Sequence, residues 1–192
     1  IPVYRGLGET RACIESVLAS RCRSAAEIIV IDDASPEPEL TQYLRGLGGV
    51  TLLANAANLG FVATVNRGMA LHPERDVVLL NSDTVVANDW LDRLRECAWR
   101  EPATSSVTPF SNNATICSYP GFCADNALPQ GMSVAELDAL FRDTNRGASV
   151  AIPTAVGFCM YIRRDCLEQV GLFDVARFGR GYGEENEFCL RA

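Results

Sequence analysis

The sequence predicts an α/β domain with a mostly parallel central sheet and helices on both faces of that sheet. Apolar runs alternate with segments of helical periodicity four times in the first hundred residues, which is typical of strand–helix–strand units with right-handed crossovers. These runs are apolar on consecutive positions, which indicates strands that are covered on both faces. With 192 residues, of which 48% are hydrophobic and 21% charged, the chain is long enough to bury a full core.

The expected elements follow one another without an internal repeat. In the first hundred residues we expect strands at 1–4, 27–35, 50–54 and 76–84, and helices at 9–20, 36–46, 61–71 and 89–100. The rhythm then changes, and we expect strands at 107–110 and 155–163, an ordered loop at 117–131, and helices at 134–143, at 165–170 and from 184 onward. Ser133 and Glu136 have the spacing of a capping box, which predicts where the helix at 134 begins.

The composition excludes several classes of protein. A net charge of −7 argues against a nucleic-acid-binding domain, which needs a basic surface. All 17 basic residues are arginine, so Schiff-base chemistry and a P-loop, which both need a lysine amine, are excluded. The single histidine, His72, would have to carry any catalytic triad or histidine-based zinc site, and we interpret it instead as a cation-capable residue near a helix C-terminus. Gly6 and Gly8 begin a dinucleotide-binding pattern, but Arg11 stands where its third glycine belongs.

The eight cysteines form no CxxC pair, and several lie in apolar surroundings. This pattern favours buried reduced thiols in a cytosolic protein over a disulfide framework. No apolar run approaches the length of a membrane span. Because the chain starts within a strand and ends within a helix, we expect a piece of a longer protein.

Carboxylates follow two of the expected parallel strands, at Asp32 and Asp33 and at Asp83. Open α/β sheets bind ligands at the carboxyl ends of their strands. Asp83 could hold Mg²⁺ or Mn²⁺ if substrate phosphates and waters supply the other oxygens. The carboxylate on the other strand could accept hydrogen bonds from a nucleobase or a ribose. Asp83 could equally cap the helix that starts near residue 88, and the strand alone does not decide between these roles.

A third group of acids, Glu184, Glu185 and Glu187, opens the last helix after a glycine-rich loop at 178–183. The helix macrodipole explains one or two of these acids, and Glu187 has the spacing of an ion pair with Arg191. A flexible loop that leads into a pair of carboxylates is also typical of a general base beside a substrate cleft.

Taken together, these segments resemble the inverting family-2 glycosyltransferases. The resemblance rests on seven segments that occur in the order of that family, at 1–4, 29–35, 58–68, 79–84, 157–164, 170–174 and 181–191. It implies the GT-A fold, a Rossmann-like three-layer α/β/α domain whose sheet is mixed in its C-terminal part. Residues 1–100 would then form the nucleotide-sugar-binding half, and residues 101–192 the remainder of the same domain with the helix of the catalytic base.

The resemblance also implies roles for the donor-binding residues. Asp33 would bind the nucleobase, Pro2 and Tyr4 would line the same pocket, and Asn58 and Gly60 would lie near the nucleoside. The remaining donor-binding residues would be Ser82, Asp83 and Gly157. Asp83 would bind the Mg²⁺ or Mn²⁺ that bridges the donor diphosphate, and Ser82 stands where many members carry an earlier aspartate.

The catalytic pair would be Glu184 and Glu185, with Glu185 as the base in place of the usual aspartate. It would take a proton from an acceptor hydroxyl, which attacks the anomeric carbon and inverts it. Segments such as 111–113 and 183–185 are similar to those of bacterial rhamnosyl- and O-antigen-type enzymes. They suggest dTDP-rhamnose, UDP- or GDP-linked donors and glycan or lipid-linked acceptors, used in the cytoplasm or at the inner face of the membrane.

Two other readings remain open. A nucleotidyltransferase uses a similar sheet and metal, but residues 5–10 lack the glycine-rich basic loop that follows its first strand. A glycosyltransferase-like module could bind sugar nucleotides or partners without turnover, and the departures at Ser82 and Glu185 are compatible with that reading.

Overall fold

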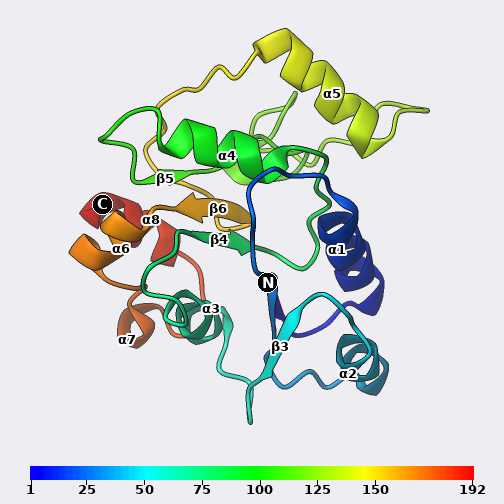
Figure 1. Cartoon of the computed structure of the whole chain (residues 1–192), viewed down its shortest axis with the longest axis vertical. Helices are drawn as coiled ribbons and strands as arrows, with labels where there is room; N and C mark the ends of the chain where they lie inside the picture. Colours follow the sequence, from blue (N-terminus) through cyan, green and yellow to red (C-terminus); the bar gives the residue numbers. More distant parts are fainter.

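A computed structural model describes all residues, 1–192, and contains two three-stranded sheets (Figure 1). The first sheet is parallel, in the order β1-β2-β3, and the second is antiparallel, in the order β4-β6-β5. The strands are β1 (Pro2–Val3), β2 (Ile29–Asp32), β3 (Thr51–Ala54), β4 (Val77–Leu80), β5 (Ser106–Val107) and β6 (Cys159–Ile162). The helices are α1 (Leu7–Ala19), α2 (Pro38–Arg45), α3 (Phe61–Met69), α4 (Trp90–Ala98), α5 (Val134–Asn145), α6 (Arg164–Val170), α7 (Val175–Phe178) and α8 (Glu184–Arg191), with a 3₁₀ turn at Thr115–Cys117.

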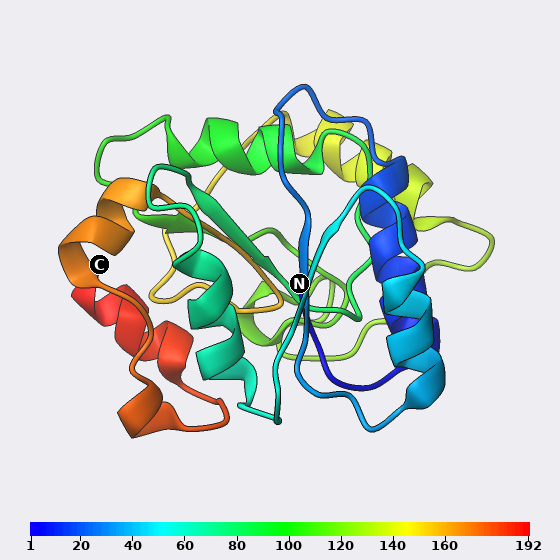
Figure 2. The same cartoon turned by 60° about the horizontal axis from the view of Figure 1, so that its bottom comes forward.

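Helices cover the sheets from opposite sides. In Figure 2, α1 and α2 lie along one side of the molecule, and α3 lies with α6, α7 and α8 on the other. Strand β6 shows why both sides are needed, because all four of its residues are buried. Met160 and Ile162 pack into a core with α3, α6 and α8, whereas Cys159 and Tyr161 pack against α1 and α4. This alternation follows from the two-residue period of a strand, and it shows that β6 is covered on both faces.

The first sheet is held by a smaller core beneath α1 and α2. Its buried residues are Val3, Ile14, Val30, Leu40 and Leu44. The alternation of short strands and helices in this part of the chain gives the expected parallel pairing, with Ile29 to Asp32 of β2 in register with Thr51 to Ala54 of β3.

Strand β4 corrects one expectation. We expected residues 76–84 to join the same parallel sheet, but β4 pairs with β6 in the antiparallel direction, with Val77 opposite Ile162. The direction of the backbone groups in β1 explains why β4 does not pair with it. The N–H groups of Ile31 and Asp33 bond the carbonyls of Ile1 and Val3, so residues 1 and 3 face β2. Residue 2 therefore faces the other edge, and as proline it has no N–H to donate there.

Most other elements lie where the sequence predicted them, within a few residues. The capping box is present, because Glu136 N–H donates to Ser133 Oγ and Ser133 N–H donates to Glu136 Oε2. The short helix α7 was not predicted. All eight cysteines are free, four of them are buried, and Cys123 is exposed. His72 lies just after α3, where its Nε2 is 2.9 Å from Glu27 Oε2.

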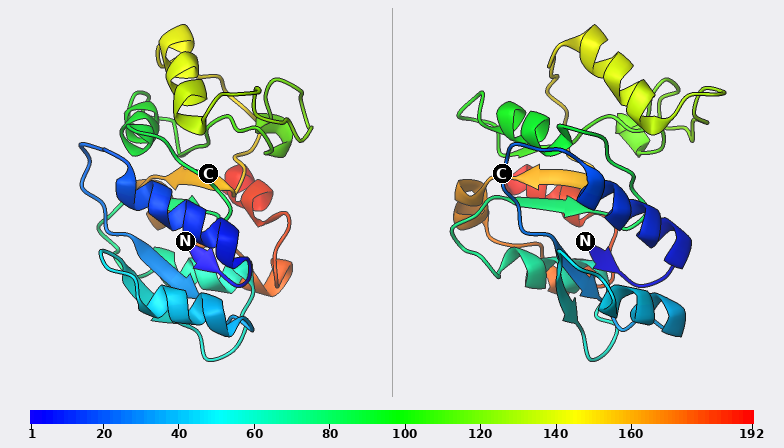
Figure 3. Two further views of the ribbon diagram at one scale, coloured as in Figure 1. Left: turned by 90° about the vertical axis from the view of Figure 1, so that its right-hand side faces the viewer. Right: turned by 45° about the vertical axis from the view of Figure 1, so that its right-hand side comes forward.

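Helix α5 stands apart from the two sheets, as both views in Figure 3 show. None of its residues is buried. No helix of the chain has both the length and the apolar content that crossing a bilayer requires.

Candidate functional site

A polar pocket of about 410 Å³ lies where the ends of β1, β2 and β4 approach one another, on the side of α3. Its size is within the range of small-molecule binding sites. It brings together seven of the eight donor-binding residues that the sequence predicted, from four separate segments of the chain. The pocket is lined by Pro2, Val3, Tyr4, Arg5, Asp33, Asn58, Gly60, Phe61, Thr64, Asn81, Ser82, Asp83 and Arg180.

The Asp33 carboxylate is buried and forms hydrogen bonds with the turn that precedes α3. Its Oδ1 accepts from Asn55 Nδ2 at 2.7 Å and from Leu59 N–H at 2.8 Å, and its Oδ2 accepts from Gly60 N–H at 2.9 Å. A carboxylate has about four acceptor positions. Three are used by the chain, which leaves one acceptor position on Oδ2 without a partner.

Asp32, its neighbour, faces away from the pocket and holds a different turn. Asp32 Oδ1 accepts from Ser35 N–H at 2.7 Å, and Oδ2 accepts from Thr41 Oγ1 at 3.3 Å. These bonds fix the entry into α2. The two adjacent carboxylates therefore have different environments, and Asp33 is the one that lines the pocket.

Gly60 allows a distant segment to close one side of the pocket. Its φ is +82°, and a Cβ there would lie 2.9 Å from the Cα of Arg180. Phe61 N–H also donates to the carbonyl of Arg180 at 3.2 Å. A glycine is required at this position both for its backbone conformation and for the close approach of the loop that leads into α8.

Asp83 is an exposed residue just beyond β4, and its carboxylate forms no hydrogen bond or ion pair within the chain. The segment around it is anchored by its neighbours, because Asn81 N–H donates to the Phe158 carbonyl at 2.8 Å. The helix-capping interpretation of Asp83 is wrong. Asp89 occupies the N-cap position of α4, and no side chain caps that helix. The Asp83 carboxylate is therefore available to a ligand.

Glu185 is half-buried and is positioned by the turn that precedes β6. Its Oε1 accepts from Gly157 N–H at 3.2 Å, and a Cβ at Gly157 would lie 3.1 Å from Glu185 Cδ. The next residue, Phe158, is the one whose carbonyl bonds Asn81. Gly157 itself does not line the pocket, and its place in the structure is against Glu185.

The other two acids of α8 differ from Glu185. Glu184 is only 2% exposed, its Oε2 has no hydrogen-bond partner, and burial raises the pKa of its carboxyl. Glu187 forms the predicted ion pair, with its Oε1 2.6 Å from Arg191 Nε. One acid is thus buried, one is paired on the helix surface, and Glu185 remains accessible.

The chain has no cluster of three or more His, Cys, Asp or Glu side chains arranged to hold a metal ion. Magnesium-type sites often use one or two carboxylates together with substrate phosphates and waters. The free carboxylate of Asp83, next to the Ser82 side chain at the pocket, fits a cation of that kind. The residues do not fit a cation enclosed entirely by protein ligands.

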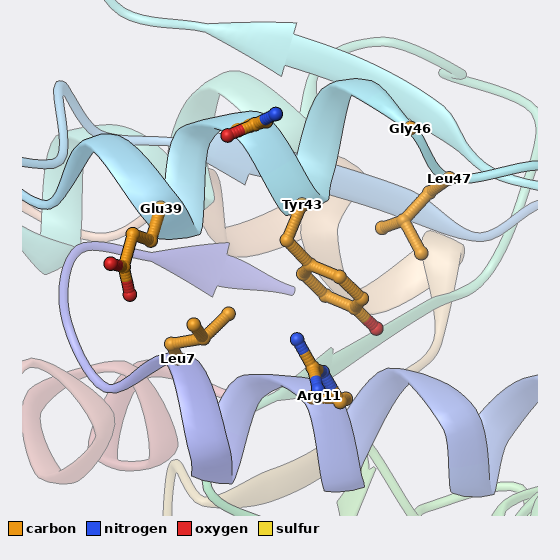
Figure 4. A pocket seen from close by; sticks show the side chains of 7 residues that line it. Leu7, Arg11, Glu39, Tyr43, Gly46 and Leu47 are labelled. Carbon is orange, nitrogen blue, oxygen red and sulfur yellow. The ribbon is translucent and has the colours of Figure 1, made fainter.

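A second hollow, of about 440 Å³, lies between α1 and α2 (Figure 4). The guanidinium of Arg11 stacks over the Tyr43 ring at 5.1 Å, and Leu7 and Leu47 lie beside them. None of the predicted site residues lines this hollow. The pocket at the strand ends is therefore the candidate site.

The sequence did not identify every residue of this pocket. Six residues that line the pocket were not assigned to the donor site: Val3, Arg5, Phe61, Thr64, Asn81 and Arg180. For Arg180 a signal was present, since it stands between two glycines in the loop before the acidic helix. Long-range packing against Gly60 places it there, and no local pattern encodes that contact.

Comparison with solved structures places this architecture in the GT-A class of folds. GalNAc-T7 with UDP, GalNAc and Mn²⁺ superposes with a TM-score of 0.67 at 17% identity, over 99% of this chain and 39% of that one. The mannosyltransferase PcManGT of Pyrobaculum calidifontis, with GDP-Man and Mn²⁺, gives 0.61 at 16% identity, over 96% and 48%. S. aureus TarS 1-349 gives 0.60 at 12% identity, over 99% and 52%.

A model of glycosyl transferase family 2 matches residues 1–171, and the chain belongs to this family. An uncharacterized protein of Sinorhizobium fredii is 30% identical over 105 residues, which cover 52% of this chain and 12% of that protein. The chain thus spans about half or less of the length of these relatives.

Proposed function

We propose that this chain is the donor-binding and catalytic domain of an inverting, metal-assisted glycosyltransferase. It would move a sugar from a nucleotide-diphosphate donor to an acceptor hydroxyl. The observation that carries the proposal is the polar pocket that gathers residues 2–5, 33, 58–64 and 81–83 beside Arg180, in the loop that leads into the helix of Glu185. Membership of the family and the UDP- and GDP-sugar complexes of GalNAc-T7 and PcManGT support it.

The nucleoside would occupy the side of the pocket formed by Pro2, Tyr4 and Asp33. Tyr4 is 39% exposed, so its ring is accessible to a base. The free acceptor position on Asp33 Oδ2 suits an N–H group of a nucleobase. Because the three hydrogen bonds to Asp33 hold the turn at 55–60, the Asn58 side of the pocket would be ordered before the ligand arrives.

The diphosphate would lie toward Ser82 and Asp83. Asp83 would hold a divalent cation, Mg²⁺ or Mn²⁺, together with oxygens from the donor and from water. Such a cation supplies stabilisation of the negative charge that develops on a departing nucleoside diphosphate. The Mn²⁺ in the GalNAc-T7 and PcManGT complexes supports the proposal of a divalent cation.

Glu185 would act as the general base. Its carboxylate is fixed by Gly157 N–H and retains acceptor positions for an acceptor hydroxyl. The carboxylate takes the hydroxyl proton as the hydroxyl oxygen forms its bond to the anomeric carbon. The bond from that carbon to the diphosphate breaks on the opposite face, and the sugar configuration is inverted.

The nucleotidyltransferase alternative is weakened by the loop after β1. Gly6 N–H donates to the carboxylate of Glu37, with its nitrogen 3.1 Å from Oε2. A phosphate-binding loop at this place would need its N–H groups for the ligand. Here one of them is already bonded to an acidic side chain.

The test is a titration of the purified chain with UDP, GDP and dTDP and with their sugars, with and without Mn²⁺, measured by calorimetry. Hydrolysis of the sugar donors is assayed in parallel. We expect preference for one base and tighter binding with Mn²⁺. Asp83→Ala should remove the Mn²⁺-dependent gain, about tenfold or more, the weight of one charge-assisted contact. Asp125→Ala, which removes an exposed acid far from the pocket in sequence, is the control.

Absence of nucleotide binding by the folded chain, with or without Mn²⁺, would contradict the proposal. Binding without any donor hydrolysis would favour the non-catalytic module. An equal Mn²⁺ effect in the wild type and in Asp83→Ala would remove Asp83 from the metal site.

A further inference from the structure

The loop that leads into α8 places Arg180 at the pocket, although no part of the proposed mechanism yet uses this residue. We propose that Arg180 binds the diphosphate of the donor and supplies positive charge that a cation held by one carboxylate leaves unmatched. This inference rests on the proposed function, because it takes the pocket to be the nucleotide-sugar site. It assigns to the reaction a residue that the sequence did not identify.

The backbone of Arg180 is fixed relative to the nucleoside side of the pocket. Its carbonyl accepts from Phe61 N–H at 3.2 Å. Its Cα, Cβ and Cγ would lie 2.9–3.2 Å from a Cβ at Gly60, so the stem of the side chain packs on the Gly60 backbone. Gly60 N–H in turn donates to Asp33. A continuous set of contacts therefore joins the predicted nucleobase acceptor to the base of the Arg180 side chain.

The guanidinium of Arg180 has no partner in the chain. It forms no ion pair or hydrogen bond, and the residue is exposed. The other arginine at the pocket, Arg5, already stacks over the Tyr4 ring at 5.4 Å. Nearby, Arg191 pairs with Glu187, and Arg177 lies over the Phe178 ring. Arg180 is thus the arginine of the pocket whose guanidinium forms no ion pair, hydrogen bond or cation–π contact within the chain.

The charge balance of the pocket explains why a guanidinium would be needed beside the diphosphate. The chain carries a net charge of −7 and has no lysine, so an anionic ligand depends on arginine for local attraction. A divalent cation shared with one carboxylate contributes one net positive charge, whereas a diphosphate carries at least two negative charges. A guanidinium can supply the remainder and can bind phosphate oxygens through two N–H groups at once.

The local backbone allows the side chain to adjust to a ligand. Gly179, Gly181 and Gly183 all have positive φ, and Tyr182 between them has φ +77° with its side chain 98% exposed. Apart from the contacts of Arg180 with Gly60 and Phe61, few side-chain contacts therefore hold this loop. Because the loop continues directly into Glu184 and Glu185, a diphosphate bound by Arg180 would order the entry of the helix that carries the proposed base.

The experiment compares nucleoside diphosphates with the matching nucleosides. Binding of UDP, GDP and dTDP, and of uridine, guanosine and thymidine, is measured by calorimetry for the wild type, Arg180→Gln, Arg5→Gln and the matched control Arg177→Gln. We expect Arg180→Gln to weaken binding of the preferred nucleoside diphosphate by about 10–100-fold, the usual weight of a hydrogen-bonded charge. Its affinity for the nucleoside should be unchanged, and Arg177→Gln should change neither.

Equal diphosphate affinity in Arg180→Gln and the wild type would overturn the inference, and so would an equal loss for diphosphate and nucleoside. If Arg5→Gln, and not Arg180→Gln, selectively weakened binding of the nucleoside diphosphate relative to the nucleoside, the phosphates would lie on the other side of the pocket. That result would also overturn the inference. Arg180→Ala provides the same comparison if the glutamine variant unfolds. A folded wild type that binds no nucleotide would instead refute the proposed function itself.

Discussion

Asp33 and Asp83 both follow a buried strand, yet their carboxylates differ in exposure and in hydrogen bonding within the chain. Asp33 ends the parallel sheet, is 4% exposed, and accepts three hydrogen bonds from the turn before α3. Asp83 follows the antiparallel sheet, is exposed, and accepts none. The hydrogen bonds that a strand-end acid already makes therefore distinguish an acid that holds the pocket together from one that is free to bind a ligand.

A different contrast, in burial, separates two acids in the first turn of α8. Glu184 is enclosed with one oxygen unpaired, whereas Glu185 is half-buried and touches the backbone at Gly157. Adjacent acids at a helix start share the same macrodipole. The difference in their surroundings, and not the helix, is what would give Glu185 a chemical role and Glu184 a structural one.

The largest expected effect is that of Glu185→Gln on transfer. Removing a general base lowers the rate by about 10²–10⁴-fold, and the amide should still accept the bond from Gly157. Donor affinity should therefore stay near the wild-type value when the two are measured side by side. Glu187→Gln, two residues further along the same helix, is the control and should keep most of the activity. Transfer by Glu185→Gln at close to the wild-type rate would refute the assignment of the base.

A smaller effect should separate Asp33 from Asp83 in stability. Asp33→Ala leaves the Asn55 amide and the Leu59 and Gly60 N–H groups without their acceptor, so the free energy of unfolding should fall by about 1–3 kcal/mol. Asp83→Ala removes no internal bond and should change it by less than about 0.5 kcal/mol. Urea unfolding of both variants measures the difference. Equal losses would show that the hydrogen bonds to Asp33 do not stabilise the turn.

The smallest expected effect is the pH dependence of stability at Glu184. Burial raises the pKa of this carboxyl above its value in the unfolded chain. The wild type therefore loses stability as pH rises from about 4.5 through the folded pKa, because a buried charge must form. Glu184→Gln lacks this loss, so its stability relative to the wild type should increase from pH 4 to pH 7.

Glu136→Gln is the control with the opposite sign. The Ser133 N–H bond lowers the pKa of Glu136, so its contribution is present at neutral pH and is lost as pH falls. Thermal unfolding between pH 4 and pH 7 compares the two variants. A flat difference between Glu184→Gln and the wild type would argue against a buried, ionisable Glu184.

Much of the fold could be predicted because local patterns encode it. Apolar runs such as 29–32 and 77–80, and the capping box at 133–136, depend on neighbours in sequence. The partner of β4 could not be predicted in this way. It depends on the missing N–H of Pro2 at one edge and on β6, which lies about eighty residues further along the chain.

The site was predicted to a similar depth. Acids at strand ends and at a helix start are visible in the sequence, and the family resemblance assigned them roles that stay predictions. Their hydrogen-bond partners are not visible, because Asn55 and Leu59 reach Asp33 only after the turn has folded. Arg180 and Gly60 are in contact although they are 120 residues apart in the sequence, and the only local sign of this contact is the pair of glycines that flank Arg180.

The contact of Glu185 with Gly157 has a consequence for how such a domain can change over time. A side chain at position 157 would occupy the space that the Glu185 carboxylate now fills. The longer acid and the glycine are therefore compatible as a pair, and neither position can be exchanged freely on its own. An aspartate at 185, shorter by one methylene, would release room at 157. The length of the acid at position 185 thus determines which residues position 157 tolerates.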